Sequence, residues 1–153
     1  MPVVNAGAAQ AWFIAGTIVF IVAGAAHVLL GLVDTVRPTF FAPIEESAKA
    51  VMEGTGVRLV RMGGGGGARP SMWSVWVGIH IGFGLGILTF GVLCLVLAAH
   101  DFTLVEQIDT IRPLTIAVSA AYVATSLRFF FRGPTLLVGM ATACFTVATL
   151  LSA

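Results

Sequence analysis

The sequence predicts an all-α integral membrane protein, an up-and-down bundle of four transmembrane helices, and two observations support this fold class. Of its 153 residues, 58% are hydrophobic and only 10% are charged, whereas about a quarter of the residues in soluble domains are charged. From Val75 to Ala99, His80 is the one ionisable side chain. A helix of that length, rising about 1.5 Å per residue, crosses a hydrocarbon layer about 30 Å thick. Lipid offers no hydrogen-bond partners, so the backbone there must bond to itself, as a helix does.

We expect one transmembrane domain over residues 1–153, with helices at about residues 11–33, 73–99, 111–131 and 135–151. Trp12 suits a membrane interface at the start of the first helix, and Pro38 cannot continue its hydrogen bonds. Pro113 is tolerated in the first turn of the third helix. Gly133 and Pro134 are expected to turn the chain into the fourth.

The long connection is the loop of residues 34–72. Pro43 and Glu46 are typical of a helix start, and Gly54 is typical of a helix end. The apolar residues between them share one face: Ile44, Ala48, Val51 and Met52. We therefore expect a short amphipathic helix at the membrane interface. The five glycines at 63–67 are not followed by the Gly-Lys-Ser/Thr of a phosphate loop, so a flexible tether is predicted.

Positive charge predicts the orientation. All of the eight lysine and arginine residues except Arg112 fall in the two loops that an up-and-down bundle places on one side, after the first and the third helix. Positive loops stay in the cytoplasm. The loop of residues 34–72 is therefore expected to be cytoplasmic, and both termini are expected outside.

Small and polar residues recur at spacings of three and four on every expected helix, and in lipid such residues mark the packed faces. On the first two helices these residues are Thr17, Phe20, Gly24, His27, Gly31, Asp34, then His80, Gly84, Ile87, Gly91 and Cys94. On the last two they are Arg112, Thr115, Ser119, Tyr122, Ser126, then Thr135, Gly139, Thr142, Thr146 and Thr149. Together they would form a polar bundle core. Alternatively, the hydroxyl groups bond back to carbonyls of their own helices.

A second row on the 73–99 helix consists of Gly78, Gly82 and Gly86, a double G-x-x-x-G pattern. Such glycines let a neighbouring helix backbone approach closely, either within this chain or in another copy. With Gly24 and Gly31 they form the predicted helix-packing glycines. The expected partners are the lipid bilayer and other membrane helices or further copies of the chain. A net charge of +1 gives no reason to expect nucleic acid.

His27 and His80 form the one constellation that suggests chemistry. His27 lies six residues before Val33 and His80 five residues after Val75, so on antiparallel helices the two fall at similar depth near the same membrane surface. Asp34 shares the face of His27. Ionisable residues inside a membrane are costly and are functional candidates by default.

Several uses of this pair are open. The two imidazoles could ligate heme iron from opposite sides, with Gly24, Gly31 and Gly84 leaving room for the macrocycle. They could hold a transition metal together with a carboxylate from Asp34, Glu45 or Glu46. They could also hydrogen-bond a quinone, pigment or lipid headgroup. Alternatively, each histidine donates to a helix carbonyl, a threonine or Tyr122 and only joins the helices.

No enzyme is indicated, because no serine, histidine and acid can be placed at one depth. Cys94 and Cys144 form no C-x-x-C and are expected as buried free thiols. The predicted function is a non-catalytic accessory subunit or small binding protein of a membrane complex, docking through glycine-rich helix faces. The alternative is a redox or ligand-binding protein that uses His27 and His80, with Asp34 and Tyr122 as further ligand contacts.

The stretch FIVAGAAHVLLGLVDTVRPTFFAP, followed after the loop by GIHIGFGLGILTFGVLCLVLA, resembles small bacterial four-helix membrane proteins, including the DoxX-like group. The similarity lies in a G-x-x-H-x-x-x-G helix, an aromatic and proline exit, and a glycine-rich second helix. The resemblance implies a bacterial inner-membrane location and an accessory role. It transfers no catalytic residues.

Overall fold

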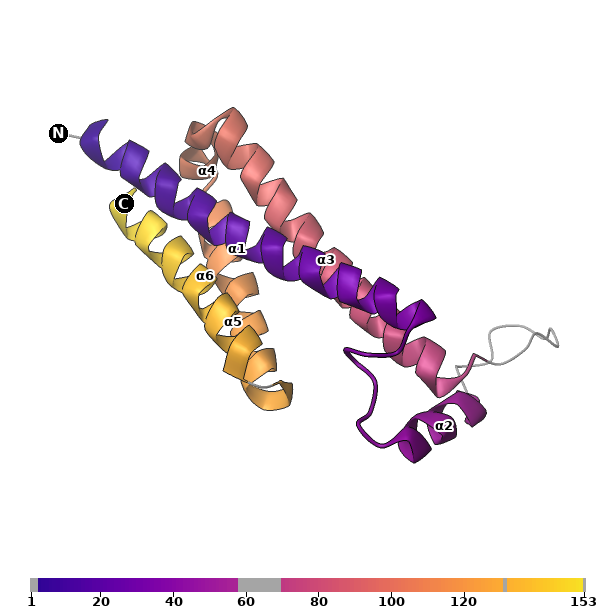
Figure 1. The fold of residues 1–153 in the computed structure, drawn as a ribbon. Coiled ribbons are helices and arrows are strands. Elements are labelled where there is room, and N and C mark those ends of the chain that lie inside the picture. Colours follow the sequence, from indigo (N-terminus) through magenta and orange to yellow (C-terminus); the bar gives the residue numbers. More distant parts are fainter. Residues whose placement is uncertain (1–2, 58–69, 131, 153) are drawn as a thin grey trace. The chain divides into compact units, whose positions relative to one another are not determined.

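The computed structural model of the protein describes residues 3–57, 70–130 and 132–152, and the regular elements in them are the α-helices α1 to α6 (Figure 1). Three helices are long and apolar enough to cross a membrane: α1 (Val3–Val36), α3 (Met72–His100) and α6 (Arg132–Leu151). Between them lie α2 (Glu46–Gly54), α4 (Phe102–Gln107) and α5 (Ile111–Phe129). The tether expected at residues 63–67 lies outside the described residues.

The helix bounds differ from the expected ones mainly at α1 and α6. The helix expected at residues 11–33 begins at Val3 and continues to Val36, because no residue before Pro38 interrupts its hydrogen bonds. The prediction that Gly133 and Pro134 turn the chain was wrong. Both lie in the first turn of α6, where proline gives up no helical hydrogen bond.

The expected helix at residues 111–131 exists as α5, but α5 is not among the three candidate spans. Arg112 and Arg128 lie near its ends, and serine, threonine and tyrosine lie between them, which lowers its hydropathy. The short helix α4 is capped by Asp101, whose carboxylate accepts hydrogen bonds from the hydroxyl and the backbone N–H of Thr103. These two bonds hold the pKa of Asp101 below its usual range.

The chain divides into two compact units, which are described separately. The first contains Met1–Gly24 and Gly86–Ala153, and the second contains Ala25–Leu85. The first unit has an aromatic core on the described parts of α1, α3, α5 and α6. Phe13, Phe20 and Phe145 are almost fully buried, and the rings of Phe13 and Phe145 meet edge to face at 5.1 Å. The free thiols Cys94 and Cys144 are buried in the same unit.

A glycine lets α3 approach α1 within the first unit. A Cβ atom on Gly91 would lie 2.9 Å from the backbone nitrogen of Ile21 and 3.0 Å from the Cβ of Phe20. No larger residue fits there without moving a helix, because the nearest atoms belong to the backbone and to the stem of a core side chain. Gly91 belongs to the row predicted to face inward.

At seven of its serine and threonine residues, the predicted polar bundle core is not built from hydrogen bonds between helices. In the described residues, the hydroxyls of Thr17, Thr115, Ser119 and Ser126 are buried, and each donates to a carbonyl three residues earlier on its own helix. The α6 threonines 142, 146 and 149 bond four residues back and are only half-buried. The buried face of α6 is instead apolar, with Val138, Ala141, Cys144, Phe145 and Ala148. Back-bonding satisfies a hydroxyl without a partner helix.

The second unit consists of the end of α1, the loop with α2, and the start of α3. The loop closes against itself through Val57, whose N–H donates to the Pro70 carbonyl, and through Met72, whose N–H donates to the Thr55 carbonyl. Helix α2 begins at Glu46 rather than at Pro43 and has no buried residue. The described chain does not cover the apolar row expected at this helix, since Ile44 and Val51 are exposed. Lys49 bonds Glu53 and lies 5.8 Å from the centre of the Trp73 ring.

Candidate functional site

The second unit brings His27 of α1 and His80 of α3 together. Their ring centres are 5.8 Å apart, with the ring planes inclined by 30°. Gly84 permits this approach, because a Cβ atom at this position would lie 2.8 Å from the Cβ of His27 and 2.8 Å from the backbone nitrogen of Val28. Gly31 permits a second close approach, with Ile81 at 2.7 Å from the same hypothetical atom. Close packing of two helix backbones therefore sets the distance between the histidines.

Asp34 organises the chain that leaves α1. Its side chain is 0% exposed. One carboxylate oxygen, Oδ1, accepts hydrogen bonds from the backbone N–H groups of Thr39 and Phe40 at 2.7 and 2.9 Å. The other, Oδ2, accepts from the N–H of Phe41 at 2.6 Å. The carboxylate thus folds the segment after Pro38 back toward α1, and this use differs from the ligand role predicted for it.

This turn places the ring of Phe41 against the rings of the two histidines. Its ring stacks on the ring of His80 at 4.0 Å, with the planes only 7° apart, and its centre is 5.3 Å from that of His27. The carbonyl oxygen of Phe41 accepts a hydrogen bond from Nε1 of Trp76 at 3.0 Å. That bond holds the loop against the start of α3.

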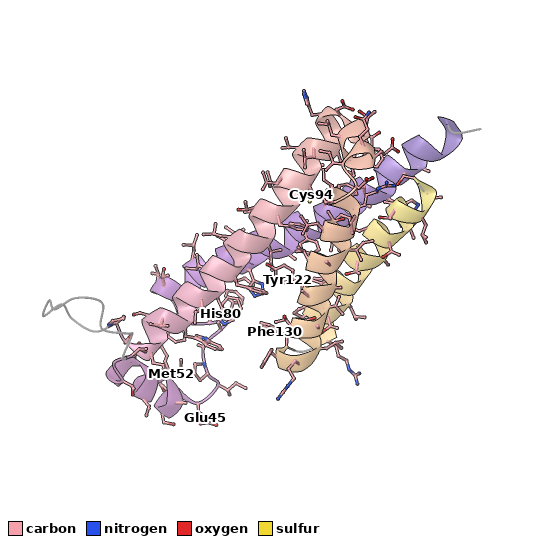
Figure 2. All side chains as sticks on the ribbon, turned by 180° about the vertical axis from the view of Figure 1, so that it is seen from behind. Glu45, Met52, His80, Cys94, Tyr122 and Phe130 are labelled. Carbon is pink, nitrogen blue, oxygen red and sulfur yellow. The ribbon has the colours of Figure 1, made fainter. Side chains whose placement is uncertain are left out.

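Two further aromatic rings complete the surroundings. Trp76, one turn before His80 on α3, meets the His80 ring edge to face at 4.6 Å. Phe83 meets the ring of His27 at 5.4 Å. We call Phe41, Trp76 and Phe83 the aromatic cage of the pair. His80, labelled in Figure 2, is only 7% exposed.

Each imidazole has one buried nitrogen that lacks a hydrogen-bond partner in the described part of the chain. The Nε2 atoms of His27 and His80 are buried and have no hydrogen-bond partner among the described residues. A buried polar atom left without a partner costs about 1–3 kcal/mol. The interpretation that the histidines only join helices through hydrogen bonds therefore has no support from these two atoms.

A buried carboxylate is linked to the pair. Asp34 accepts the N–H of Phe41, and the ring of Phe41 stacks on His80. In the part of the chain that the structure describes, the one ion pair is that of Lys49 with Glu53, so Asp34 faces no lysine or arginine at salt-bridge distance. Three backbone N–H groups stabilise the carboxylate, but they do not cancel its charge.

The other predicted site residues take different places. Tyr122 belongs to the first unit, where its ring meets Phe20 edge to face at 5.7 Å. Gly24 is buried, as is Gly31. Gly78 and Gly82 have open space around them, with no atom within 4 Å of an added Cβ, and at Gly86 only the Tyr122 hydroxyl approaches, at 3.8 Å. Among the described residues, no helix backbone meets glycines 78, 82 and 86 at close range, so the helix-packing use of this row stays a prediction.

Room for a heme was expected beside Gly24, Gly31 and Gly84. The spaces at Gly31 and Gly84 are filled by Ile81, His27 and Val28. These glycines therefore serve helix packing. In the described ranges, no group of three or more histidine, cysteine, aspartate or glutamate residues could hold a metal ion, so a site with Asp34 or a glutamate as third ligand is not formed.

The cage residues were missed by the sequence reasoning. A signal for two of them exists, because Trp76 and Phe83 lie four residues before and three residues after His80, on the same side of a helix. Phe41 has no such signal, since its position depends on how the Asp34 carboxylate folds the loop.

The three apolar helices place the chain in the class of helical membrane proteins, compatible with several crossings of the bilayer. Comparisons with protein-family models, with curated proteins and with solved structures found no match.

Proposed function

We propose that the protein is a small, non-catalytic binding protein of a membrane, and that its ligand is held by His27 and His80. The observation that carries this proposal is the pair of buried Nε2 atoms without a partner in the described chain. A ligand that bonds both nitrogens would remove a cost of about 1–3 kcal/mol for each.

The surroundings suit a site rather than a packing contact. The neighbouring polar groups already have partners: the Asp34 carboxylate takes three backbone N–H groups, and the Trp76 N–H is given to the Phe41 carbonyl. The aromatic cage packs against the imidazoles, whose Nε2 atoms are buried. Two acceptor or donor atoms inside an apolar enclosure are the usual composition of a small-molecule site.

The ligand content of the protein tests the proposal. We expect wild-type protein, gently extracted from its native membrane, to carry a chromophore, an organic molecule or a metal in stoichiometric amount. The double variant His27→Ala/His80→Ala should have lost it, whereas His100→Ala should keep it, because His100 is exposed at the end of α3. Absorption spectra, mass spectrometry and elemental analysis read this out. Equal content in wild type and the double variant would refute the site.

A second candidate function is that of an accessory subunit which docks onto other membrane helices through α3. The observation that favours it is the open space at Gly78 and Gly82, where a neighbouring backbone could come close. The large neighbours Trp76 and Ile79 are exposed beside them. Under this hypothesis, the partner is another membrane protein or a second copy of the chain.

Substitution of Gly82 tests the docking role. Gly82→Leu should abolish assembly with the partner, since a bulky side chain keeps the helix backbones apart, while leaving the thermal stability of the isolated chain unchanged within about 0.5 kcal/mol. Gly82→Ala is the matched control and should weaken assembly far less. Size-exclusion chromatography with light scattering in mild detergent measures the assembly. If Gly82→Leu assembles as the wild type does, α3 does not dock through this face.

The membrane arrangement that goes with these functions has four spans. Helix α5 packs along α6, and its 19 residues would reach about 28 Å at 1.5 Å per residue, so we assign the fourth crossing to α5. Helix α2 would lie on the membrane surface with its open apolar row in lipid. The positive loops would be cytoplasmic and both termini outside, in a bacterial inner membrane, as the resemblance to DoxX-like proteins implies.

A further inference from the structure

We propose that the ligand of the histidine pair is one monovalent d10 metal ion, Cu(I), bound between Nε2 of His27 and Nε2 of His80. This inference rests on the proposed binding function and names the chemical class of the ligand. Four features carry it: the number of available donors, the separation of the rings, the buried charge and the aromatic cage.

The first feature is that two donors are available. The Asp34 carboxylate already accepts three backbone N–H groups, and the Trp76 N–H donates to the Phe41 carbonyl and is not a metal ligand. No third histidine, cysteine or carboxylate joins the pair in the described segments. Zinc takes four ligands, and magnesium or calcium takes six or more ligands, which are mostly oxygen atoms. Imidazole suits copper, and Cu(I) is stable with two ligands in a near-linear arrangement.

The second feature is the ring separation. A metal–nitrogen bond measures about 2 Å, so two nitrogens that both point at one ion from opposite sides are about 4 Å apart, and their ring centres are then about 6 Å apart. The observed separation of the His27 and His80 ring centres is 5.8 Å. Phe41 does not lie between the two rings, because 5.8 Å is much less than its distances of 4.0 and 5.3 Å taken together.

The third feature is charge. The Asp34 carboxylate is buried, accepts the N–H of Phe41, whose ring stacks on His80, and has no lysine or arginine at salt-bridge distance in the described chain. Two neutral imidazoles add no charge. A cation with a single positive charge would make the whole cluster neutral, whereas a divalent ion would leave an excess positive charge in a span where charge is costly.

The fourth feature is the aromatic cage. Phe41 stacks on His80, and Trp76 meets it edge to face. Aromatic surfaces attract cations. The two Nε2 atoms are buried beside these rings, and a buried position favours a low coordination number.

Titration of the full-length chain with Cu(I) tests the inference. The protein is reconstituted in lipid nanodiscs in a Cys94→Ala/Cys144→Ala background, which removes both thiols as competing ligands. Cu(I) is added anaerobically in competition with a chromophoric chelator. We expect one equivalent to bind, His27→Ala and His80→Ala each to weaken binding more than the about 10- to 100-fold typical of losing a supporting residue around a metal, and His100→Ala to leave it unchanged.

If a histidine variant does not fold, X-ray absorption of the Cu(I)-bound protein with both histidines in place still tests the inference. The spectrum should show two nitrogen ligands and no sulfur. A third ligand, sulfur coordination, or uptake that does not depend on the pair would overturn the copper assignment. If Cu(I) does not bind but an organic molecule leaves with His27→Ala, the copper assignment fails and the binding function stands. If neither is bound, both fail.

Discussion

Asp34→Ala is expected to destabilise the protein by about 3 kcal/mol, the largest effect of a single substitution in the site. Three backbone N–H groups lose a charged acceptor, and each hydrogen bond to a charged group contributes about 1.5–3 kcal/mol. Water can reach part of the exposed loop at Thr39 and Phe40, so the full sum is not expected. Thermal and denaturant unfolding in detergent measure the effect.

A graded series makes this prediction specific. Asp34→Asn keeps one carbonyl oxygen, which still accepts the bonds of Thr39 and Phe40 but cannot serve Phe41, so we expect an intermediate loss. Asp101→Ala is the control, because Asp101 also accepts two hydrogen bonds but is exposed at the start of α4. Asp101→Ala should cost much less. An Asp34→Ala protein as stable as Asp101→Ala would contradict the role assigned to this carboxylate.

Gly84→Ala is expected to destabilise the protein by about 1–3 kcal/mol, the usual cost of overpacking, and to reduce ligand retention at the site. The added Cβ would press on the His27 Cβ and on the backbone of Val28, both at 2.8 Å. Since the backbone cannot yield without moving α1, the histidines would separate. The same unfolding assay and the ligand content of the purified protein measure the two effects.

Gly82→Ala is the matched control two residues away on the same helix. No atom lies within 4 Å of its added Cβ, and replacing a helical glycine by alanine gains up to about 1 kcal/mol in helix propensity. This variant should be neutral or slightly more stable. Equal behaviour of Gly84→Ala and Gly82→Ala would show that α1 and α3 do not approach at Gly84.

Helical spacing predicted which faces of α1 and α3 are buried. On α1, Thr17, Phe20, Gly24, Gly31 and Asp34 of the predicted row are buried and His27 is half-buried. On α3, His80, Gly84, Ile87, Gly91 and Cys94 are all buried as expected. In lipid, large apolar residues can face outward at no cost, so small and polar residues reveal the packed side. The same reasoning failed for α6, where threonines satisfy themselves on their own helix and apolar residues pack instead.

Two rows of glycine on α3 show where sequence reasoning stops. The regular row of glycines 78, 82 and 86 matches the helix-packing pattern better than Gly84 and Gly91 do, yet the latter two meet the neighbouring helix. The glycine pattern does not say which of the two rows faces a neighbouring helix of the same chain, so both rows are compatible with the sequence. The packing of the surrounding side chains decides which row faces that helix.

The candidate site was predictable only in part. Its two histidines follow from their depth on antiparallel helices. Its cage does not, because Phe41 reaches His80 only through a loop conformation that the Asp34 carboxylate imposes. The sequence also suggested Asp34 as a ligand, since a buried carboxylate near histidines resembles a metal site. A carboxylate that caps a turn has the same sequence signature.

We propose that the Nε2 atoms of His27 and His80 are free to bind a ligand, and ¹⁵N NMR of the labelled imidazoles in lipid bilayers can show this. We expect neither Nε2 to be hydrogen-bonded to a protein group in the ligand-free chain. We also expect both Nε2 resonances to move together when the site is filled, while the His100 resonances stay in place. A hydrogen bond from either Nε2 to a helix carbonyl or a hydroxyl would contradict the claim and make the histidines structural.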